Sequence, residues 1–591
     1  MTDKKRGRLY AVLLAAVIIL QCIALVYIFA VKKTSFHEDE VFSYALSNSY
    51  KRPFIYGSAH QVVDNYDVWF TGTEFRDYIR TNEDTRFRYD SVWYNQAEDV
   101  HPPLYYAILH TICSVNTGKF SWWYAFAINL VCFVLTQVFL YLFSDKVMCS
   151  KLSALLVCAF WGATLAAQNN FLFLRMYGMN TLFSVIYAYL CIGLAAGGKP
   201  DRKRCVLIAL TAFLGAMTQH FFLVYAFFVT AFVCIWLLIR KEFKHFFGVG
   251  AAAASGVALS FLAFPATISH MMPGAMIQSE EPNRRNQMIR IGSQLGRGLF
   301  GIEWLNTDLF LFSFVALCVI IPLMIPLLFL FRKEPWMLRF RAYLKKRIKE
   351  MPERAGKIRS TIPPAVLIII ICAVFYVVVS GLYCYNDFGE DSERYYYQIT
   401  PLIVLAFIWL ALTIISIIPF RKARIAMHSA LVISLAAAIV YQHCTYKMTF
   451  VISSDTEKGY IKEYTANSDC ILLSASPIYL PIYTFMLEEA DDIYFTCYGE
   501  ARYIDDDLLA EYQKLFDQDE PFILILDEAN FCKPEDEYSE DLLVKARYRK
   551  EKTEEFALEW FSEKSGRNPE RLTAETAQVN RVVAFRFDPQ T

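Results

Sequence analysis

Three acidic side chains follow directly on the first long apolar run of the chain. The stretch FHEDEVFSYAL at 36–46 contains four consecutive titratable residues, His37, Glu38, Asp39 and Glu40. A carboxylate at a membrane surface, here Asp39, can act as a general base toward an acceptor hydroxyl, and neighbouring carboxylates favour this role by raising a carboxyl pKa toward neutrality. The alternative is helix capping, because acidic residues are common in the first turn of a helix.

A second group of titratable residues precedes two prolines, in AEDVHPPLYY at 97–106. Asp99 is a candidate helix cap, and His101 a candidate residue of the membrane interface. Alternatively, Glu98 or Asp99 together with His101 could ligate a divalent cation or orient an acceptor. A carboxylate with an imidazole suits zinc or manganese. The spacing does not decide between these alternatives, so a metal is an open expectation.

Two arginines stand at the ends of apolar segments, Arg175 in FLFLRMYGM and Arg394 in SERYYYQITPL. A charge at a membrane boundary is unfavourable and marks a functional candidate, and an arginine matches phosphate oxygens bidentately. The alternatives are snorkelling to the surface or pairing with a carboxylate. His220 begins another apolar segment, where a single histidine is usually structural. Together the arginines predict binding of an anionic lipid head group.

The elements that must position these residues are membrane-spanning helices. The chain has 55% hydrophobic residues, more than a soluble domain, and no nucleic-acid partner is expected. We expect a polytopic α-helical membrane protein with about eleven transmembrane helices. They are predicted at 9–31, 121–143, 151–168, 176–196, 204–218, 221–239, 247–268, 307–331, 363–384, 398–419 and 425–445.

Basic clusters predict which helix ends face the cytoplasm. Lys and Arg gather at 4–8, 197–204, 240–244, 332–359 and 421–424. One multi-pass topology places them all on the cytoplasmic side, provided that the short, proline-led segment 102–116 is an interfacial or re-entrant helix. The N-terminus is then cytoplasmic and the tail extracytoplasmic. The same topology assigns to the outer side Asp39, His101, Arg175, His220 and Arg394.

The tail differs from the membrane part in charge and pattern. Residues 451–591 carry a net charge of −16, and the first 450 carry +16. Strand patterns alternate with helical ones, which predicts a small α/β domain with a mainly parallel sheet. Strands are expected at 470–476, 492–499, 521–528 and 581–588, and helices around 479–489, 506–517 and 553–565.

Two domains are therefore expected. The transmembrane domain covers 1–446 and includes an aromatic-rich outer loop at 32–101 with juxtamembrane helices. The acidic extracytoplasmic domain covers 447–591, and we expect it to be a noncatalytic cover or a surface for a partner.

In order, these stretches resemble motifs of the GT-C class glycosyltransferases, membrane enzymes that use polyprenyl-phosphate sugars and include protein O-mannosyltransferases and the lipid A aminoarabinose transferase. HEDEVFSYAL resembles their Asp-Glu motif after the first span, and DVHPPLYYAILH resembles their His-Pro-Pro segment. LRMYGM is similar to their Arg-x-Tyr motif, TQHFFLVY to the His-aromatic motif that follows, and ERYYYQITPLIVL to their late Arg-Tyr motif. The bacterial RgtA/B/C/D-like branch is the most similar.

The resemblance implies an inverting transfer of a hexose or pentose from a polyprenyl-phosphate donor to a hydroxyl of an extracytoplasmic glycan, lipid or protein. It implies that Asp39 is the catalytic acidic residue, acting as the general base, with Glu40 beside it. The residues implied to bind substrate are His101, Arg175, Tyr177, His220, Arg394 and Tyr395. Some relatives bind a divalent metal near the site and others show none.

Two other functions fit a protein of this composition. A transporter or flippase of lipid-linked saccharides would carry charges along its spans, whereas here most charges stand at one end. A noncatalytic membrane scaffold that displays the acidic tail leaves the outer-side residues unexplained. The transferase is therefore the favoured hypothesis.

Overall fold

The computed structural model describes residues 3–55, 68–199, 201–272, 284–302, 342, 363–383, 390–474, 477–497, 509–528, 554–577 and 580–589. The chain divides into two compact units. The helical unit comprises Met1–Val26 and Ile128–Thr449, and the sheet unit comprises Tyr27–Ala127 and Phe450–Thr591. Each is described by itself below.

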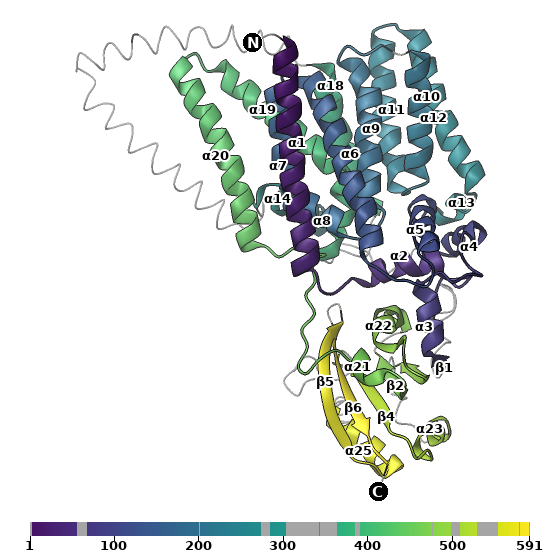
Figure 1. Ribbon diagram of the computed structural model, residues 1–591. Coiled ribbons are helices and arrows are strands. Elements are labelled where there is room, and N and C mark those ends of the chain that lie inside the picture. The colour runs from purple at the N-terminus through teal and green to yellow at the C-terminus, as the bar shows by residue number, and fades with distance from the viewer. Residues whose placement is uncertain are drawn as a thin grey trace. The chain divides into compact units, whose positions relative to one another are not determined.

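The helical unit is built from long apolar helices (Figure 1). Their bounds are α1 Asp3–Tyr27, α6 Trp123–Met148, α7 Lys151–Trp161, α8 Leu165–Leu172, α9 Tyr177–Ala195, α10 Arg202–Ala216, α11 Phe221–Ile239, α12 Phe243–Ala263, α13 Thr267–His270, α14 Arg284–Phe300, α18 Pro364–Tyr383, η2 Glu390–Ile399, α19 Thr400–Ile417 and α20 Arg421–Thr445.

In the described residues, eight helices are long and apolar enough to cross a membrane, or nine if α7 and α8, bent by 62°, form one span. The expected polytopic helical architecture is therefore confirmed. The segment predicted as a span at 204–218 is helix α10, but its fifteen residues fall short of a spanning length. The predicted span at 307–331 and, apart from residue 342, the basic stretch 332–359 lie outside the described residues.

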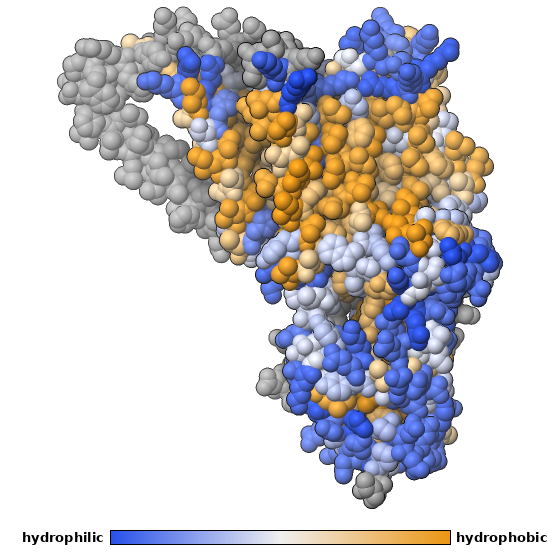
Figure 2. Space-filling view, in the orientation of Figure 1, coloured by the Kyte–Doolittle hydropathy of each residue, from blue (hydrophilic) through white to orange (hydrophobic). Residues whose placement is uncertain are grey.

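Successive helices of this unit run in opposite directions, so that its basic clusters share one end (Figure 1). That end holds the start of α1, the α9–α10 and α11–α12 connections and the start of α20. On the face drawn in Figure 2, apolar side chains cover the length of the helices and hydrophilic ones gather at that end. The opposite end holds the α8–α9 junction, the α10–α11 turn and the start of α19, which η2 directly precedes in the chain. These segments carry candidate residues.

The sheet unit combines short helices with one six-stranded sheet. Its elements are α2 Glu38–Asn48, β1 Val68–Thr71, α3 Gly72–Ile79, α4 Tyr89–Glu98, α5 Leu104–Val115, α21 Lys462–Thr465, β2 Asp469–Ser474, η3 Pro477–Tyr483, α22 Thr484–Leu487, β3 Asp492–Cys497, α23 Leu509–Phe516, β4 Phe522–Asp527, α25 Glu554–Ser565, β5 Pro569–Ala577 and β6 Asn580–Phe587.

The strand order is β1-β3-β2-β4-β6-β5. The four strands expected from the sequence are present as β2, β3, β4 and β6, and β2 and β4 are buried almost throughout because they lie centrally. The expectation of a mainly parallel sheet was wrong, because among the described strands two pairs, β2–β3 and β2–β4, are parallel and the other three are antiparallel. Strands β5 and β6 follow each other with a short connection, which permits only an antiparallel pair.

The aromatic outer loop contributes to this sheet. Strand β1 pairs antiparallel with β3, with Val68 opposite Phe495 and Thr71 opposite Asp492. The structure thus differs from the expected division, in which the loop at 32–101 belonged to the transmembrane domain. The reason is that β1 and β3 pair although they lie far apart in the sequence, and the local sequence of neither strand indicates its partner.

Candidate functional site

Asp39 stands in the first turn of α2, and a capping box fixes the start of this helix. The Nδ1 atom of His37 accepts the backbone N–H of Asp39 at 3.1 Å, and the Glu40 carboxylate accepts the backbone N–H of His37 at 2.8 Å. The capping alternative therefore holds for His37 and Glu40. The Asp39 side chain is half-buried.

Glu40 also forms a buried ion pair with Lys33. The Lys33 ammonium lies 2.7 and 2.8 Å from the two carboxylate oxygens, and both side chains are fully inaccessible to solvent. Lys33 Nζ donates a third hydrogen bond to the carbonyl of Phe450 at 2.5 Å. These contacts point to a structural role for Glu40 in place of the expected catalytic one, since both of its oxygens are engaged. Sequence reasoning missed Lys33, which resembles an ordinary basic residue at the end of a span.

The chain on either side of this ion pair is held by backbone contacts. The backbone N–H groups of Thr34 and Ser35 both donate to the carbonyl of Ile452 at 3.0 Å. The Ser454 N–H donates to the Thr34 hydroxyl at 2.8 Å. The segment that precedes α2 is therefore hydrogen-bonded to the segment that leads into the sheet. These bonds fix the backbone just before the helix turn that carries Asp39.

Charged and hydroxyl groups of the sheet gather near the same turn. Helix α2 packs against η3, which carries Tyr479. Burial raises the pKa of Tyr479, and the charges of Glu38 and then Asp527 raise it further. Asp527 is itself buried and accepts the Tyr483 hydroxyl at 2.5 Å. Tyr479 thus lies within electrostatic reach of both Glu38 at the α2 start and Asp527 of β4, a carboxylate to which sequence reasoning assigned no role.

The expected metal candidates form a pair. His101 Nδ1 lies 2.7 Å from Asp99 Oδ2, and both side chains are mostly buried. Glu98 ends α4 just before them. Within the described ranges, no three or more His, Cys, Asp or Glu side chains are grouped to hold a metal. Asp99 and His101 thus supply two possible ligands, and a metal at this pair stays a prediction.

The segment after the prolines forms α5, with twelve residues, as expected for a helix too short to span. Its His110 is 1% exposed, and its Nδ1 atom lies 3.4 Å from the Asn48 side-chain oxygen on α2. Burial lowers the pKa of His110 to about 4, so the ring is neutral at pH 7. His110 supports α2 as a buried structural histidine.

Three of the residues implied to bind substrate meet in the helical unit. The Arg394 guanidinium lies over the Tyr395 ring, 5.3 Å from its centroid. The Tyr395 ring in turn meets Tyr177 edge-on at 6.4 Å and Phe221 at 5.1 Å between centroids. These side chains come from η2 and from the starts of α9 and α11. Residues far apart in sequence thus form one aromatic and cationic cluster, hereafter the Arg394 cluster.

Arg175 and His220 lie on neighbouring connections of the same unit. Arg175, between α8 and α9, is 3% exposed, so its side chain does not snorkel out to the surface of the protein. His220 Nε2 lies 3.3 Å from His270 Nδ1 of α13, a partner that the sequence did not suggest. His220 directly precedes Phe221, which touches the Arg394 cluster.

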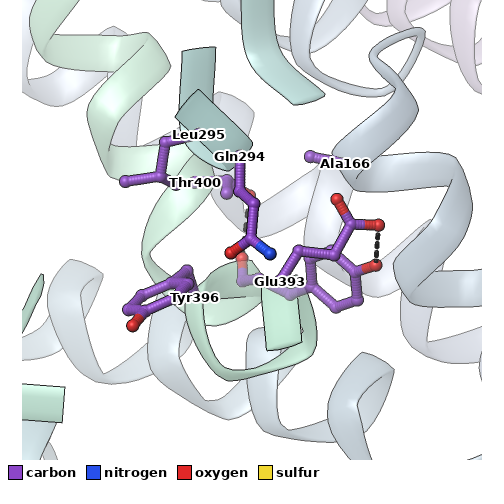
Figure 3. Close-up of a pocket in the computed structure, with 7 residues that line it drawn as sticks. Ala166, Gln294, Leu295, Glu393, Tyr396 and Thr400 are labelled. Atoms are coloured by element: carbon purple, nitrogen blue, oxygen red, sulfur yellow. Dashed lines mark hydrogen bonds between the residues drawn. The ribbon is translucent and has the colours of Figure 1, made fainter. Parts of the chain in front are cut away.

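A small pocket lies beside this cluster (Figure 3). Its volume of about 10 Å³ has room for about one water molecule, and it is lined by Ala166, Gln294, Leu295, Glu393, Tyr396, Tyr397 and Thr400. One oxygen of Glu393 accepts the Tyr397 hydroxyl at 2.8 Å, and the other points toward Ala166. Sequence reasoning assigned no role to Glu393, although it immediately precedes Arg394.

Among known proteins, the chain matches solved structures only. No protein-family model matches the chain, and no curated protein matches it. Two solved structures of ArnT from Cupriavidus metallidurans, one in the apo state and one bound to undecaprenyl phosphate, are similar with a TM-score of 0.44 and 10% identity. The match covers 98% and 97% of this chain, respectively, and 98% of each ArnT chain. The proposals that follow rest on the residues of this chain.

Proposed function

We propose that this protein is an integral membrane glycosyltransferase that moves a sugar from a polyprenyl-phosphate donor to a hydroxyl of an extracytoplasmic acceptor, with inversion. The observation that supports it most is the convergence of Tyr177, Arg394 and Tyr395 from separate segments. They lie at the end of the helical unit opposite to its basic clusters, where the predicted topology assigns the outer side.

Asp39 and the arginines take separate parts of the proposed reaction. Asp39 accepts the proton of the acceptor hydroxyl, and the hydroxyl oxygen forms a bond to the anomeric carbon from the face opposite the phosphate. The bond between the anomeric carbon and the phosphate oxygen breaks, and its electron pair leaves with the lipid phosphate. This chemistry suits a glycan, a lipid or a protein as acceptor, since each offers a hydroxyl.

The leaving phosphate gains negative charge as the bond breaks, so cations that face it lower the barrier. Arg394 and Arg175 are the side chains proposed for this role. A guanidinium suits it because its N–H groups match two phosphate oxygens and it stays charged when partly desolvated. The Tyr395 ring lies under the Arg394 guanidinium, and its hydroxyl accepts a hydrogen bond from Arg394 Nη2 at 3.4 Å. Tyr177 packs edge-on against the Tyr395 ring.

The test compares cells that lack the gene with cells supplied with the wild type or Asp39→Asn. Mass spectrometry of surface glycans and of lipid-linked sugars detects a change whichever sugar and acceptor are used. We expect the variant to insert normally, to lower transfer by about 10²–10⁴-fold, as for loss of a general base, and to leave the sugar-loaded lipid accumulated.

Glu38→Gln is the matched control, because it removes a carboxylate one residue earlier in the same turn and should transfer sugar like the wild type. Full transfer by Asp39→Asn would refute the assigned base. Translocation of lipid-linked sugar by purified protein in liposomes, with no new glycosidic bond, would favour a transporter instead.

A further inference from the structure

The segment that carries Arg394 and Tyr395 has an unusual backbone. Helix η2 is a 3₁₀ helix of ten residues, whereas 3₁₀ runs longer than three or four residues are uncommon because their hydrogen bonds are poorly aligned. Such a segment needs support from outside itself. The buried η2 side chains Glu393 and Gln398 obtain that support by bonding to neighbouring helices.

Glu393 makes the first link. One of its oxygens accepts hydrogen bonds from Asn169 Nδ2 at 2.8 Å, the Tyr397 hydroxyl at 2.8 Å and the Thr449 hydroxyl at 3.0 Å. Glu393 is 6% exposed and Asn169 is 2% exposed. Because Asn169 belongs to α8, this bond ties η2 to the helix that leads into Arg175.

Gln398 makes the second link. Its side-chain oxygen accepts hydrogen bonds from the Asn180 amide and from the Ser184 hydroxyl, both on α9. Its amide group donates to the carbonyl of Phe221 at 3.2 Å, next to His220. This second link therefore joins η2 to α9 and to the start of α11.

The two links follow the same order along the stretch 169–180 and along the stretch 393–398. Asn169 and Asn180 bracket the stretch that contains Arg175 and Tyr177, and Glu393 and Gln398 bracket Arg394 and Tyr395. A segment tied at two points cannot slide along its partner without breaking at least one of the two hydrogen bonds. The positions of the two arginine-bearing stretches are thus coupled by buried side chains other than the arginines themselves.

We propose that the Asn169–Glu393 and Asn180–Gln398 links are positioning devices that hold Arg175, Arg394 and their tyrosines in the one arrangement that binds the donor phosphate. This inference rests on the proposed function. Polar links suit the task better than apolar packing, because a hydrogen bond has a preferred direction and a buried donor left without its acceptor is unfavourable. A third bond, from the Tyr376 hydroxyl to the Tyr395 carbonyl at 2.7 Å, supports η2 from α18.

The experiment measures binding of undecaprenyl phosphate to the full-length protein in nanodiscs, alongside hydrogen exchange of residues 390–399. Glu393→Leu removes the acceptor, and we expect binding to weaken by about 10–100-fold, which corresponds to loss of hydrogen bonds to a charged group. Amide exchange in η2 should rise in the same variant. Glu393→Gln keeps an acceptor oxygen and should bind within about 3-fold of the wild type.

Gln137→Leu is the matched control. Gln137 is fully buried in the same unit and donates to Gln21 Oε1 at 2.8 Å and to the Cys158 carbonyl at 3.2 Å, away from η2. Its replacement breaks a comparable buried network, so binding and η2 exchange should not change. If Glu393→Leu does not fold, Asn169→Ala serves in its place, because it leaves the Tyr397 and Thr449 donors on Glu393.

The outcomes separate the two proposals. Absence of binding by the wild-type protein would count against the donor class of the proposed function. Binding by the wild type with equal binding by Glu393→Leu or Asn169→Ala would overturn the positioning role alone. An equal loss in Glu393→Leu and Gln137→Leu would also overturn it, since it would show a general loss of structure.

Discussion

Each half of the molecule places a buried glutamate beside its candidate reactive residue, but the two glutamates are held in different ways. Glu40 follows Asp39 and is neutralised by the ammonium of Lys33. Glu393 precedes Arg394 and accepts hydrogen bonds from three uncharged donors, while in the described residues Arg297 of α14 acts on it through charge without a hydrogen bond between them. Both glutamates are nearly inaccessible to solvent.

The difference indicates how each region should respond to substitution. In a buried ion pair each charge is compensated by a single partner. Removal of that partner leaves an uncompensated charge away from water. Neutral donors can bond to the oxygen of an uncharged amide as well as to a carboxylate, so the Glu393 network does not depend on a charge at its acceptor. We therefore expect the α2 start to be sensitive to single changes of charge and the η2 support to tolerate an amide in place of the carboxylate.

The largest expected effect is that of Lys33→Met. It leaves the Glu40 carboxylate buried without its cation, and loss of one partner of a buried pair lowers the free energy of unfolding by about 3–5 kcal/mol. Thermal unfolding of the purified protein in nanodiscs measures the change. The double variant Lys33→Met/Glu40→Gln removes both charges and should recover most of the stability and of the sugar transfer.

The matched control for this pair is Lys514→Met in the same unit. Lys514 pairs with Asp492 at 2.5 Å, but both side chains are about half exposed, so the loss should stay below about 1 kcal/mol. Equal losses in Lys33→Met and Lys514→Met, or no recovery in the double variant, would contradict the charge-compensation role.

Substitution of Arg394 should have the next largest effect. Arg394→Ala should weaken the binding of undecaprenyl phosphate by about 100-fold and Arg394→Lys by about 10-fold, because lysine keeps the charge but loses the planar fork. Arg240→Ala is the matched control: its guanidinium also lies over an aromatic ring, that of Trp236 at 5.1 Å, but it belongs to the α11–α12 connection and not to η2. Unchanged binding in Arg394→Ala would remove this residue from the proposed phosphate site.

The smallest expected effect is a pH dependence of stability caused by His110. This residue is buried in a third way, as a neutral side chain. His110 is held neutral, with a pKa of about 4 against about 6.5 in an unfolded chain. Between these values the unfolded state binds more protons, so stability falls as the pH is lowered. From pH 7 to pH 5 the loss should be about 2 kcal/mol, and His110→Gln should show a smaller dependence. Identical pH profiles of the two proteins by thermal unfolding would contradict this.

Much of the architecture was predictable from local patterns. Apolar runs located the long apolar helices that the structure describes, whereas helix α14 falls in a stretch where no helix was predicted. Strand patterns located the four main strands of the tail. The order of the motifs also named Tyr177, Arg394 and Tyr395, which the structure brings together. The distribution of basic residues predicted their shared end of the helical unit, because each span reverses the direction of the chain.

Other features depend on partners that lie far away in the sequence. Strand β1 carries no sign that it pairs with β3, and β5 was not expected at all. Nothing in the stretch VKKTSFHEDE indicates that Lys33 is buried. One of its hydrogen-bond acceptors is the carbonyl of Phe450, which lies far away in the sequence. The same holds for Glu393, whose donors come from α8, from η2 itself and from the end of the helical unit.

The sequence by itself determined the polytopic helical class, the acidic helix start and the identity of the reactive candidates, because hydrophobicity, capping preference and side-chain chemistry are local properties. Only the tertiary structure decided which glutamate compensates a lysine and which one supports an arginine segment. That choice depends on the groups that surround a buried carboxylate, and folding brings those groups from distant parts of the chain.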